Sequence, residues 1–418
     1  MTAPRLVAAL LAGLAFIDTL IFSQATKDSF VLKETVAALL ILAAWTIVAV
    51  AGLRPGVGAL GWPLLAWLGA GLLSFVNSAD WILSGRALFF MALWASCYWL
   101  GRMAPEAWRL RTVRAAVLAG LVTSIYGLIQ HVGLDPLDWA TTFEGRPTGT
   151  MGNPNFLAGY LVAALPAALM LAWRGERGGV AAAFAMFAAL ILTQTRGAWF
   201  ALAGGLASFA ALARFQIANR KPDPRAGVAA AVVLLILLGP RVAGRARAML
   251  SPAESSRVER IFKWETALEM VRDHPVLGVG LGTLKTQFAT YQWKVRDRWM
   301  AEGHPIALRG TSESNVHNEY LQTAAQTGLL GLAAFLWVWA AALTMIWRRR
   351  AEPLAAAAGA GVVGVLVYSV TNFPLQIEPT ACWVFLSLGL AERGGDEREA
   401  SVPGSPHPRA IVCLLVAS

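Results

Sequence analysis

The chain has 418 residues, of which 57% are hydrophobic and only 14% are charged, whereas soluble chains average about 45–50% apolar and about 25% charged residues. With a mean hydropathy of +0.55, this composition excludes a soluble globular protein and predicts an all-α, polytopic membrane helix bundle. The net charge of +10 does not indicate a nucleic-acid partner, because membrane proteins concentrate Lys and Arg in their cytoplasmic loops.

Apolar runs are the main signal along the chain, since a helix needs roughly 20 apolar residues to cross the hydrocarbon layer. Charged or Pro/Gly-marked breaks divide the sequence into about twelve such runs, each a predicted transmembrane helix. The predicted segments are 6–22, 34–53, 60–77, 82–100, 113–132, 154–173, 179–194, 197–213, 226–240, 320–347, 354–372 and 379–391.

The distribution of Lys and Arg supports this count. With a cytoplasmic N-terminus and every run crossing, the short cytoplasmic segments hold 18 of these residues and the short outer segments hold five. The other 12 lie in 241–319, and long loops cross largely regardless of charge. We therefore expect helices one to nine in 1–240, a large periplasmic loop in 241–319, helices ten to twelve in 320–391, and a cytoplasmic tail, or the start of a truncated further segment, in 392–418.

The long loop has helical periodicity of its own. Two amphipathic helices are predicted, on the outer membrane face or over the bundle, because apolar residues recur at helical spacing on either side of a glycine-rich segment. That segment, Gly278–Gly282, follows no predicted strand, so we interpret it as a tight turn and not as a nucleotide-binding loop. The apolar positions are Val258, Ile261, Ala267, Leu268 and Val271, after Ser255-Ser256 and before His274-Pro275, and then Phe288, Tyr291, Val295 and Trp299.

His317 is the candidate general base. Ser314 is a plausible N-cap for the tenth span, which would place His317 in the first helical turn. A helix N-terminus disfavours imidazolium, so the ring should be neutral and able to accept a proton. The alternative is an interfacial histidine without a chemical role.

Two arginines on the outer face are candidates for anion binding. Arg196 lies in the short turn between the seventh and eighth spans, and Arg260 lies on the first helix of the loop. A guanidinium offers paired donors that match a phosphate. The alternatives are a cation that snorkels to the membrane surface for Arg196 and a solvated helix face for Arg260.

No cofactor or metal is expected. The three cysteines, Cys97, Cys382 and Cys413, lie in apolar runs without paired spacing. The five histidines show no ligand spacing such as His-Glu-x-x-His; they are His131, His274, His304, His317 and His407.

Several segments resemble those of the O-antigen ligase superfamily, in the order that the family has them, over roughly residues 30–391. These segments are Gly152–Gly159, Thr193–Gly197, Arg260 to Trp264 followed by His274–Gly280, and His317–Leu321. The resemblance implies a metal-independent glycosyltransferase of the bacterial inner membrane that uses an undecaprenyl diphosphate-linked glycan on the periplasmic face. It implies transfer to lipid A-core in a ligase, to a growing polysaccharide in a repeat-unit polymerase, or to protein in an O-oligosaccharyltransferase. The motif set is most similar to the ligase branch.

The resemblance also implies residue roles. His317 corresponds to the loop histidine, and Arg196 and Arg260 correspond to the arginines that stabilise the leaving diphosphate, although Arg257 lies one turn before Arg260. Arg146 and Asn153 are expected to line the donor groove, and Glu319 to orient His317 or hold a sugar hydroxyl. The alternative from another class is a transporter of the kind proposed for bicarbonate, for which Asp18 is the main intramembrane ionisable residue.

Overall fold

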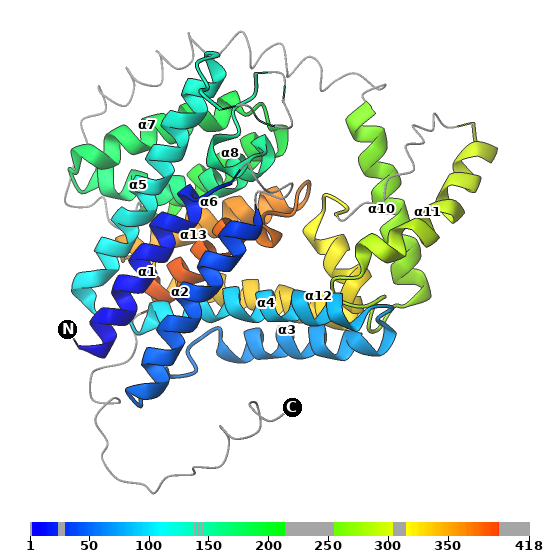
Figure 1. The fold of residues 1–418 in the computed structure, drawn as a ribbon, viewed down its shortest axis with the longest axis horizontal. Helices are drawn as coiled ribbons and strands as arrows, with labels where there is room; N and C mark the ends of the chain where they lie inside the picture. Colours follow the sequence, from blue (N-terminus) through cyan, green and yellow to red (C-terminus); the bar gives the residue numbers. More distant parts are fainter. Residues whose placement is uncertain are drawn as a thin grey trace, which may run out of the picture.

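The computed structural model describes residues 2–23, 30–137, 139, 143, 145–213, 255–303 and 315–392. These residues form helices joined by turns, with no strand among them, which confirms the all-α class (Figure 1). The helices are α1 (Ala3–Leu20), α2 (Phe30–Val50), α3 (Gly61–Leu73), η1 (Ser74–Asn77), α4 (Trp81–Arg102), α5 (Glu106–His131), η2 (Gly149–Met151), α6 (Pro154–Trp173), α7 (Arg177–Leu192), α8 (Arg196–Ala213), α10 (Ser255–Asp273), α11 (Leu284–Ala301), α12 (Glu319–Arg348), α13 (Pro353–Ser369), η4 (Pro374–Gln376) and α14 (Glu378–Ala391).

Eleven of the twelve predicted segments coincide with helices, and α6 has the predicted bounds 154–173. Among the described helices, six are long and apolar enough to cross a membrane, namely α1, α2, α4, α5, α6 and α12, whereas α3 with η1, α7, α8 and α13 are apolar but shorter. The ninth predicted segment, 226–240, lies outside the described residues, as do 241–254 and 304–314 of the long loop and 393–418 of the tail. The number of crossings and the side of each loop stay predictions.

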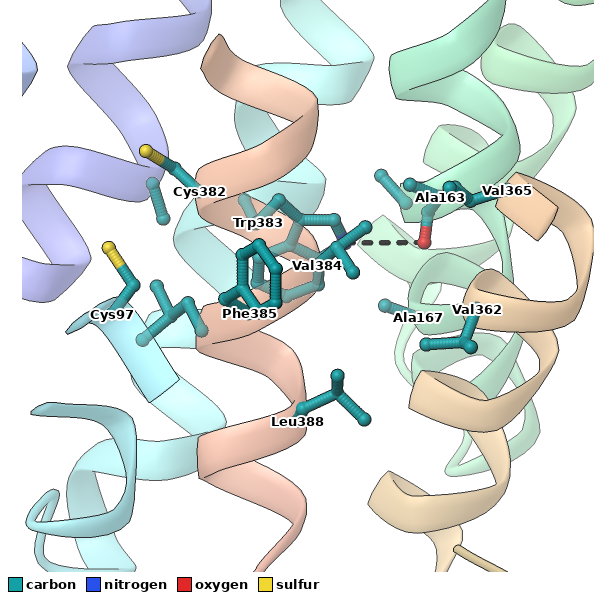
Figure 2. Packing of buried hydrophobic residues seen from close by; sticks show 14 of the residues in the cluster. Cys97, Ala163, Ala167, Val362, Val365, Cys382, Trp383, Val384, Phe385 and Leu388 are labelled. Carbon is teal, nitrogen blue, oxygen red and sulfur yellow. Dashed lines mark hydrogen bonds between the residues drawn. The ribbon is translucent and has the colours of Figure 1, made fainter. Parts of the chain in front are cut away.

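The bundle core is packed through small residues and large aromatic side chains. A Cβ added to Gly361 of α13 would lie 2.6 Å from the Ala163 carbonyl oxygen of α6, so the two backbones touch there. Helix α14 completes the layer, and its Trp383 indole donates a hydrogen bond to the same oxygen at 3.2 Å (Figure 2). Small residues at helix contacts are typical of membrane bundles, where close backbone approach replaces a hydrophobic driving force. Cys97 and Cys382 are free and buried in this core.

Helix α12 is interrupted at Gly328, which the continuous prediction for 320–347 missed. Gly328 has φ 69° and ψ −173°, a backbone region that is essentially confined to glycine. The chain before α11 replaces the helical hydrogen bonds that the break removes. The Leu329 amide donates to the Pro275 oxygen at 2.8 Å, and the Val279 amide donates to the Ala325 oxygen at 2.9 Å.

The glycine-rich segment is confirmed as a tight turn, and the break in α12 explains its composition. Gly278 has φ +68°, and a Cβ there would collide with the peptide that joins Gln326 to Thr327. The Gly280 amide donates to the Gln326 carbonyl at 3.0 Å. Non-helical backbone is tolerated inside a membrane bundle where protein groups satisfy it. The turn and the first part of α12 therefore form one unit.

Helices α10 and α11 lie beside the start of α12, on one side of the bundle in Figure 1. The predicted apolar face of α11 is confirmed, because Phe288, Tyr291, Val295 and Trp299 are buried. The predicted face of α10 is right only in part: Ala267 is buried and Val271 packs against the same cluster, but Ile261 is 39% exposed and Leu268 is 38% exposed. The side of α10 that packs inward instead carries Lys263, Thr266, Ala267 and Met270, because its neighbours include the polar residues before α12.

Candidate active site

The sequence predicted His317 within the first turn of α12. In the structure, His317 lies directly before this helix. Asn318 is the N-cap, since its side-chain oxygen accepts a hydrogen bond from the Leu321 amide at 3.0 Å. Ser314, the cap that the sequence suggested, lies outside the described residues. The general expectation that His317 stands at a helix N-terminus holds, displaced by one turn.

The backbone at His317 is strained and held from both sides. His317 has φ 56°, which is uncommon for a residue with a Cβ. The preceding residue, Val316, is fully buried, and its amide donates to the Gln322 side-chain oxygen at 3.1 Å. Gln322 in turn donates to the Gln376 side chain at 2.8 Å. Such strain persists where the surroundings over-determine it, and it is frequent at functional sites.

The surroundings of the His317 ring favour its neutral form. Burial, followed by the charges of Lys263 and Arg260, lowers the pKa of His317 to about 4, against the opposing effect of the neighbouring Asn372 side chain. Phe373 contacts the ring edge-to-face, with centroids 5.1 Å apart. The ring nitrogen Nδ1 is buried without a hydrogen-bond partner in the described structure. A neutral imidazole can accept a proton.

Helix α10 supplies two cations near His317. Lys263 is 4% exposed and pairs with Glu259 one turn away at 2.7 Å. Arg260 is half-buried, whereas Arg257 is exposed, so Arg260 is the arginine of this helix that faces the histidine. Burial lowers the pKa of Arg260 from its usual value, although a guanidinium keeps its charge in proteins.

Arg196 is the first residue of α8, and Arg146 supports the turn before it. The Arg146 Nε donates to the Thr193 oxygen at 2.6 Å, and its Nη2 donates to the Thr195 hydroxyl at 3.2 Å. The same hydroxyl donates to the Asn155 side-chain oxygen at 3.1 Å. Arg146 thus links the connection between α5 and α6 to the α7–α8 turn.

Tyr368, near the end of α13, joins these parts. Its hydroxyl donates to the Asn155 carbonyl at 2.8 Å, and its ring is near enough to Arg260 and Arg146 for electrostatic interaction with both. Gly197, next to Arg196, packs so closely that an added Cβ would lie 3.4 Å from the Tyr368 ring and collide with the Thr371 hydroxyl. The structure therefore brings the segments of Arg146, Arg196 and Arg260 together around one tyrosine.

Asn153 and Glu319 have structural contacts of their own. Asn153 is the N-cap of α6 and accepts from the Asn155 amide at 2.8 Å. Glu319 is buried and accepts from the Leu375 amide at 3.3 Å and the Gln376 side chain at 3.2 Å. These bonds hold η4, which follows Asn372 and Phe373. Glu319 is thus placed to affect His317 through that segment.

Several residues at this site were not predicted from the amino-acid pattern. Tyr368 and Asn372 lie at the end of an apolar run, where a tyrosine usually indicates an interfacial anchor. Lys263 was hidden because the apolar pattern assigned the opposite face of α10 to the interior. Asn155 lies two residues after the candidate Asn153 and has the contacts that Asn153 lacks. A single signal could have found it, the repeated Asn in Asn153-Pro154-Asn155.

The fold and the site define a multi-pass helical membrane protein in which a neutral histidine lies among cations, a setting suited to chemistry on an anionic substrate. Residues 181–336 match the family model described as O-antigen ligase. This stretch includes Arg196, Arg260 and His317, and the match supports the resemblance to the O-antigen ligase superfamily over these residues. No curated protein matches the chain.

Proposed function

We propose that this protein transfers a glycan from undecaprenyl diphosphate to an acceptor hydroxyl on the periplasmic face of the bacterial inner membrane. The acceptor is lipid A-core, as in an O-antigen ligase. One observation carries the proposal: a strained, neutral histidine faces cations from α10. It lies where the start of α8, the start of α12 and the end of α13 meet. The excess of Lys and Arg in the opposite loops supports the periplasmic placement.

The cations hold the diphosphate of the donor. Arg196 and Arg260 offer paired donors to phosphate oxygens, and Arg146 keeps the turn of Arg196 in place. Arg196 also stands at a helix N-terminus, where backbone amides and the helix dipole favour an anion. These fixed positive charges stabilise the charge that grows on the leaving diphosphate as the glycosidic bond breaks, so we propose that transfer needs no metal ion.

His317 acts as the general base. It takes the proton from the acceptor hydroxyl while the acceptor oxygen bonds to the anomeric carbon and the bond to the diphosphate oxygen breaks. With a pKa of about 4 the free site is a weak base. The bound diphosphate places negative charge beside Lys263 and Arg260, and an opposite charge nearby raises the pKa of an imidazole. Donor binding therefore makes His317 a stronger base.

A repeat-unit polymerase or a protein O-oligosaccharyltransferase would use the same donor and the same base. The three activities differ only in the acceptor. The description of the matching family model, O-antigen ligase, supports the ligase.

The transporter alternative rests on Asp18, whose backbone oxygen takes part in a link between two helices. Asp18 is 2% exposed, and the buried Lys33 donates to its backbone oxygen at 2.9 Å and to that of Thr19 at 3.0 Å. These bonds tie the end of α1 to the start of α2.

Reconstitution tests the function directly. Purified protein in liposomes receives a lipid-linked donor and, in separate reactions, lipid A-core, a polysaccharide primer or an acceptor protein. We expect transfer to lipid A-core that continues in excess chelator. Transfer only to the primer or only to protein would replace the ligase by the polymerase or the oligosaccharyltransferase. Loss of activity in chelator, restored by magnesium or manganese, would contradict the arginine mechanism.

A further inference from the structure

A cavity of about 360 Å³ lies between α4 and α12, next to the candidate site but separate from the histidine and its cations. Its volume falls within the range of about 300–1,000 Å³ that small-molecule sites occupy. Asn315, two residues before His317, lines it, and so does Gln376, which follows Phe373 in η4. Whatever fills this cavity touches the segments that hold the histidine.

One wall of the cavity is polar and the other is aromatic. Amide and hydroxyl side chains of the first part of α12 form the polar wall, and Trp67, Trp94 and Phe385 stand among the apolar residues that line the rest. Flat apolar faces combined with a few fixed hydrogen-bonding groups give a site affinity and orientation. A sugar ring matches this division, because it has hydroxyls around its edge and C–H groups on its faces.

Two polar side chains of this wall have no hydrogen-bond partner in the described part of the structure. Gln326 is 9% exposed, and its side-chain amide makes no hydrogen bond there. Thr323, one turn earlier on α12, is half-buried and lines the same cavity, and its hydroxyl makes no hydrogen bond in the described part of the chain. Buried polar groups are normally satisfied. An amide can both donate to and accept from a hydroxyl, so a hydroxylated ligand satisfies both residues whereas a hydrocarbon chain leaves them unpaired.

The charges of the cavity exclude a phosphate as its ligand. Arg86 is the cation among its described lining residues, and it pairs with Glu34 at 2.5 Å. The Glu319 carboxylate is also engaged, through Leu375 and Gln376. A phosphate would meet two carboxylates and one neutralised arginine, so the charges disfavour an anionic ligand. The unpaired groups of the wall, the Gln326 amide and the Thr323 hydroxyl, are uncharged and favour a neutral ligand.

We infer that this cavity binds a neutral sugar unit of one of the glycan substrates, with Gln326 and Thr323 as the residues that bind its hydroxyls. The inference rests on the proposed function for the source of the sugar, which is either the donor glycan or the acceptor. A bound sugar contacts Asn315 and Gln376, so its binding also steadies the segments on either side of His317.

Two nearly isosteric variants test the inference. Gln326→Leu and Thr323→Val keep the volume of the wall and remove its hydrogen bonds, and Gln292→Leu on α11, outside the cavity lining, is the matched control. Binding of methyl glucoside, methyl galactoside and methyl N-acetylglucosaminide is measured without donor by saturation-transfer NMR. In the transfer assay, KM is measured separately for donor and acceptor.

We expect each cavity variant to weaken glycoside binding, or to raise one of the two KM values, by roughly 3- to 10-fold, the usual effect of one lost hydrogen bond. The substrate whose KM rises identifies the source of the sugar, and Gln292→Leu should change neither quantity. Unchanged glycoside binding and unchanged KM values in both variants would overturn the inference, as would a lower KM in Gln326→Leu, the result for a hydrocarbon chain. Because glycoside binding needs no transfer, failure of the proposed function gives a different result from failure of the cavity site.

Discussion

The packed core of α6, α13 and α14 and the unit formed by α10, α11 and the start of α12 follow different rules. In the core, small residues and aromatic rings pack α6, α13 and α14 against one another (Figure 2). In the second unit a helix breaks at Gly328, a histidine takes a left-handed backbone, and a lysine is buried. The comparison teaches that a broken helix, a left-handed histidine and a buried lysine occur together in the unit where chemistry is proposed, whereas α6, α13 and α14 pack as continuous helices.

The largest effect is expected at the turn Pro275–Gly280, which fills the break in α12. Gly278→Ala should lower the free energy of unfolding by about 3 kcal/mol or more and abolish transfer, because the new Cβ meets backbone atoms that cannot move aside. Gly303→Ala is the matched control, since Gly303 also has positive φ (+72°) but nothing within 4 Å of an added Cβ. Thermal unfolding and transfer assays compare the two. Equal effects of the two substitutions would show that glycine is needed at position 278 because of its backbone conformation alone, and not because of the close approach to α12.

Donor binding should separate Arg257 and Arg260 of α10. Arg260→Ala should weaken binding of the lipid-linked donor by roughly 10- to 100-fold, because a charge-assisted pair with phosphate contributes about 1.5–3 kcal/mol. The exposed Arg257→Ala should change it by less than about 2-fold. Binding to purified protein in detergent measures both. The reverse order would make Arg257 the functional residue.

A substitution in the core should lower stability without lowering the transfer activity of the folded protein. Gly361→Ala should lower the free energy of unfolding by about 1–3 kcal/mol, because its Cβ would press on the Ala163 carbonyl. Transfer per folded molecule should stay within about 2-fold of the unmodified protein, since neither residue lies near His317. A large loss of specific activity would mean that the core and the second unit are coupled.

The smallest expected effect is a displaced pH profile. Only neutral His317 can accept a proton, and the pKa of about 4 keeps it neutral in the free protein, so kcat/KM should stay level from neutral pH down to about pH 5. Lys263→Met removes a neighbouring cation, which raises the pKa of His317 and moves the acidic fall to higher pH by less than about one unit. The kcat profile should fall at higher pH than that of kcat/KM, because bound diphosphate also raises this pKa. A wild-type kcat/KM that already falls near pH 7 would contradict the buried, cation-flanked ring.

The sequence predicted the core better than the site for physical reasons. Apolar runs such as 154–173 define helices by length alone, and α6 has these bounds. The break at Gly328 was invisible because hydropathy continues through it and its partner, Pro275–Gly280, lies about fifty residues earlier. The roles of Lys263 and Tyr368 depend on interactions with residues that are distant in sequence, so no local pattern indicates them. His317, Arg196 and Arg260 were found because the resemblance indicated them.

The central claim is that His317 accepts the proton of the acceptor while the cations hold the donor. The most direct measurement is single-turnover transfer by His317→Ala in liposomes preloaded with lipid-linked donor, together with donor binding by the same variant. We predict that donor binding stays within about 3-fold of the unmodified protein while transfer falls by roughly 10²–10⁴-fold, the range for a lost general base. Near-normal transfer by the folded variant would contradict the account and remove the histidine from the mechanism.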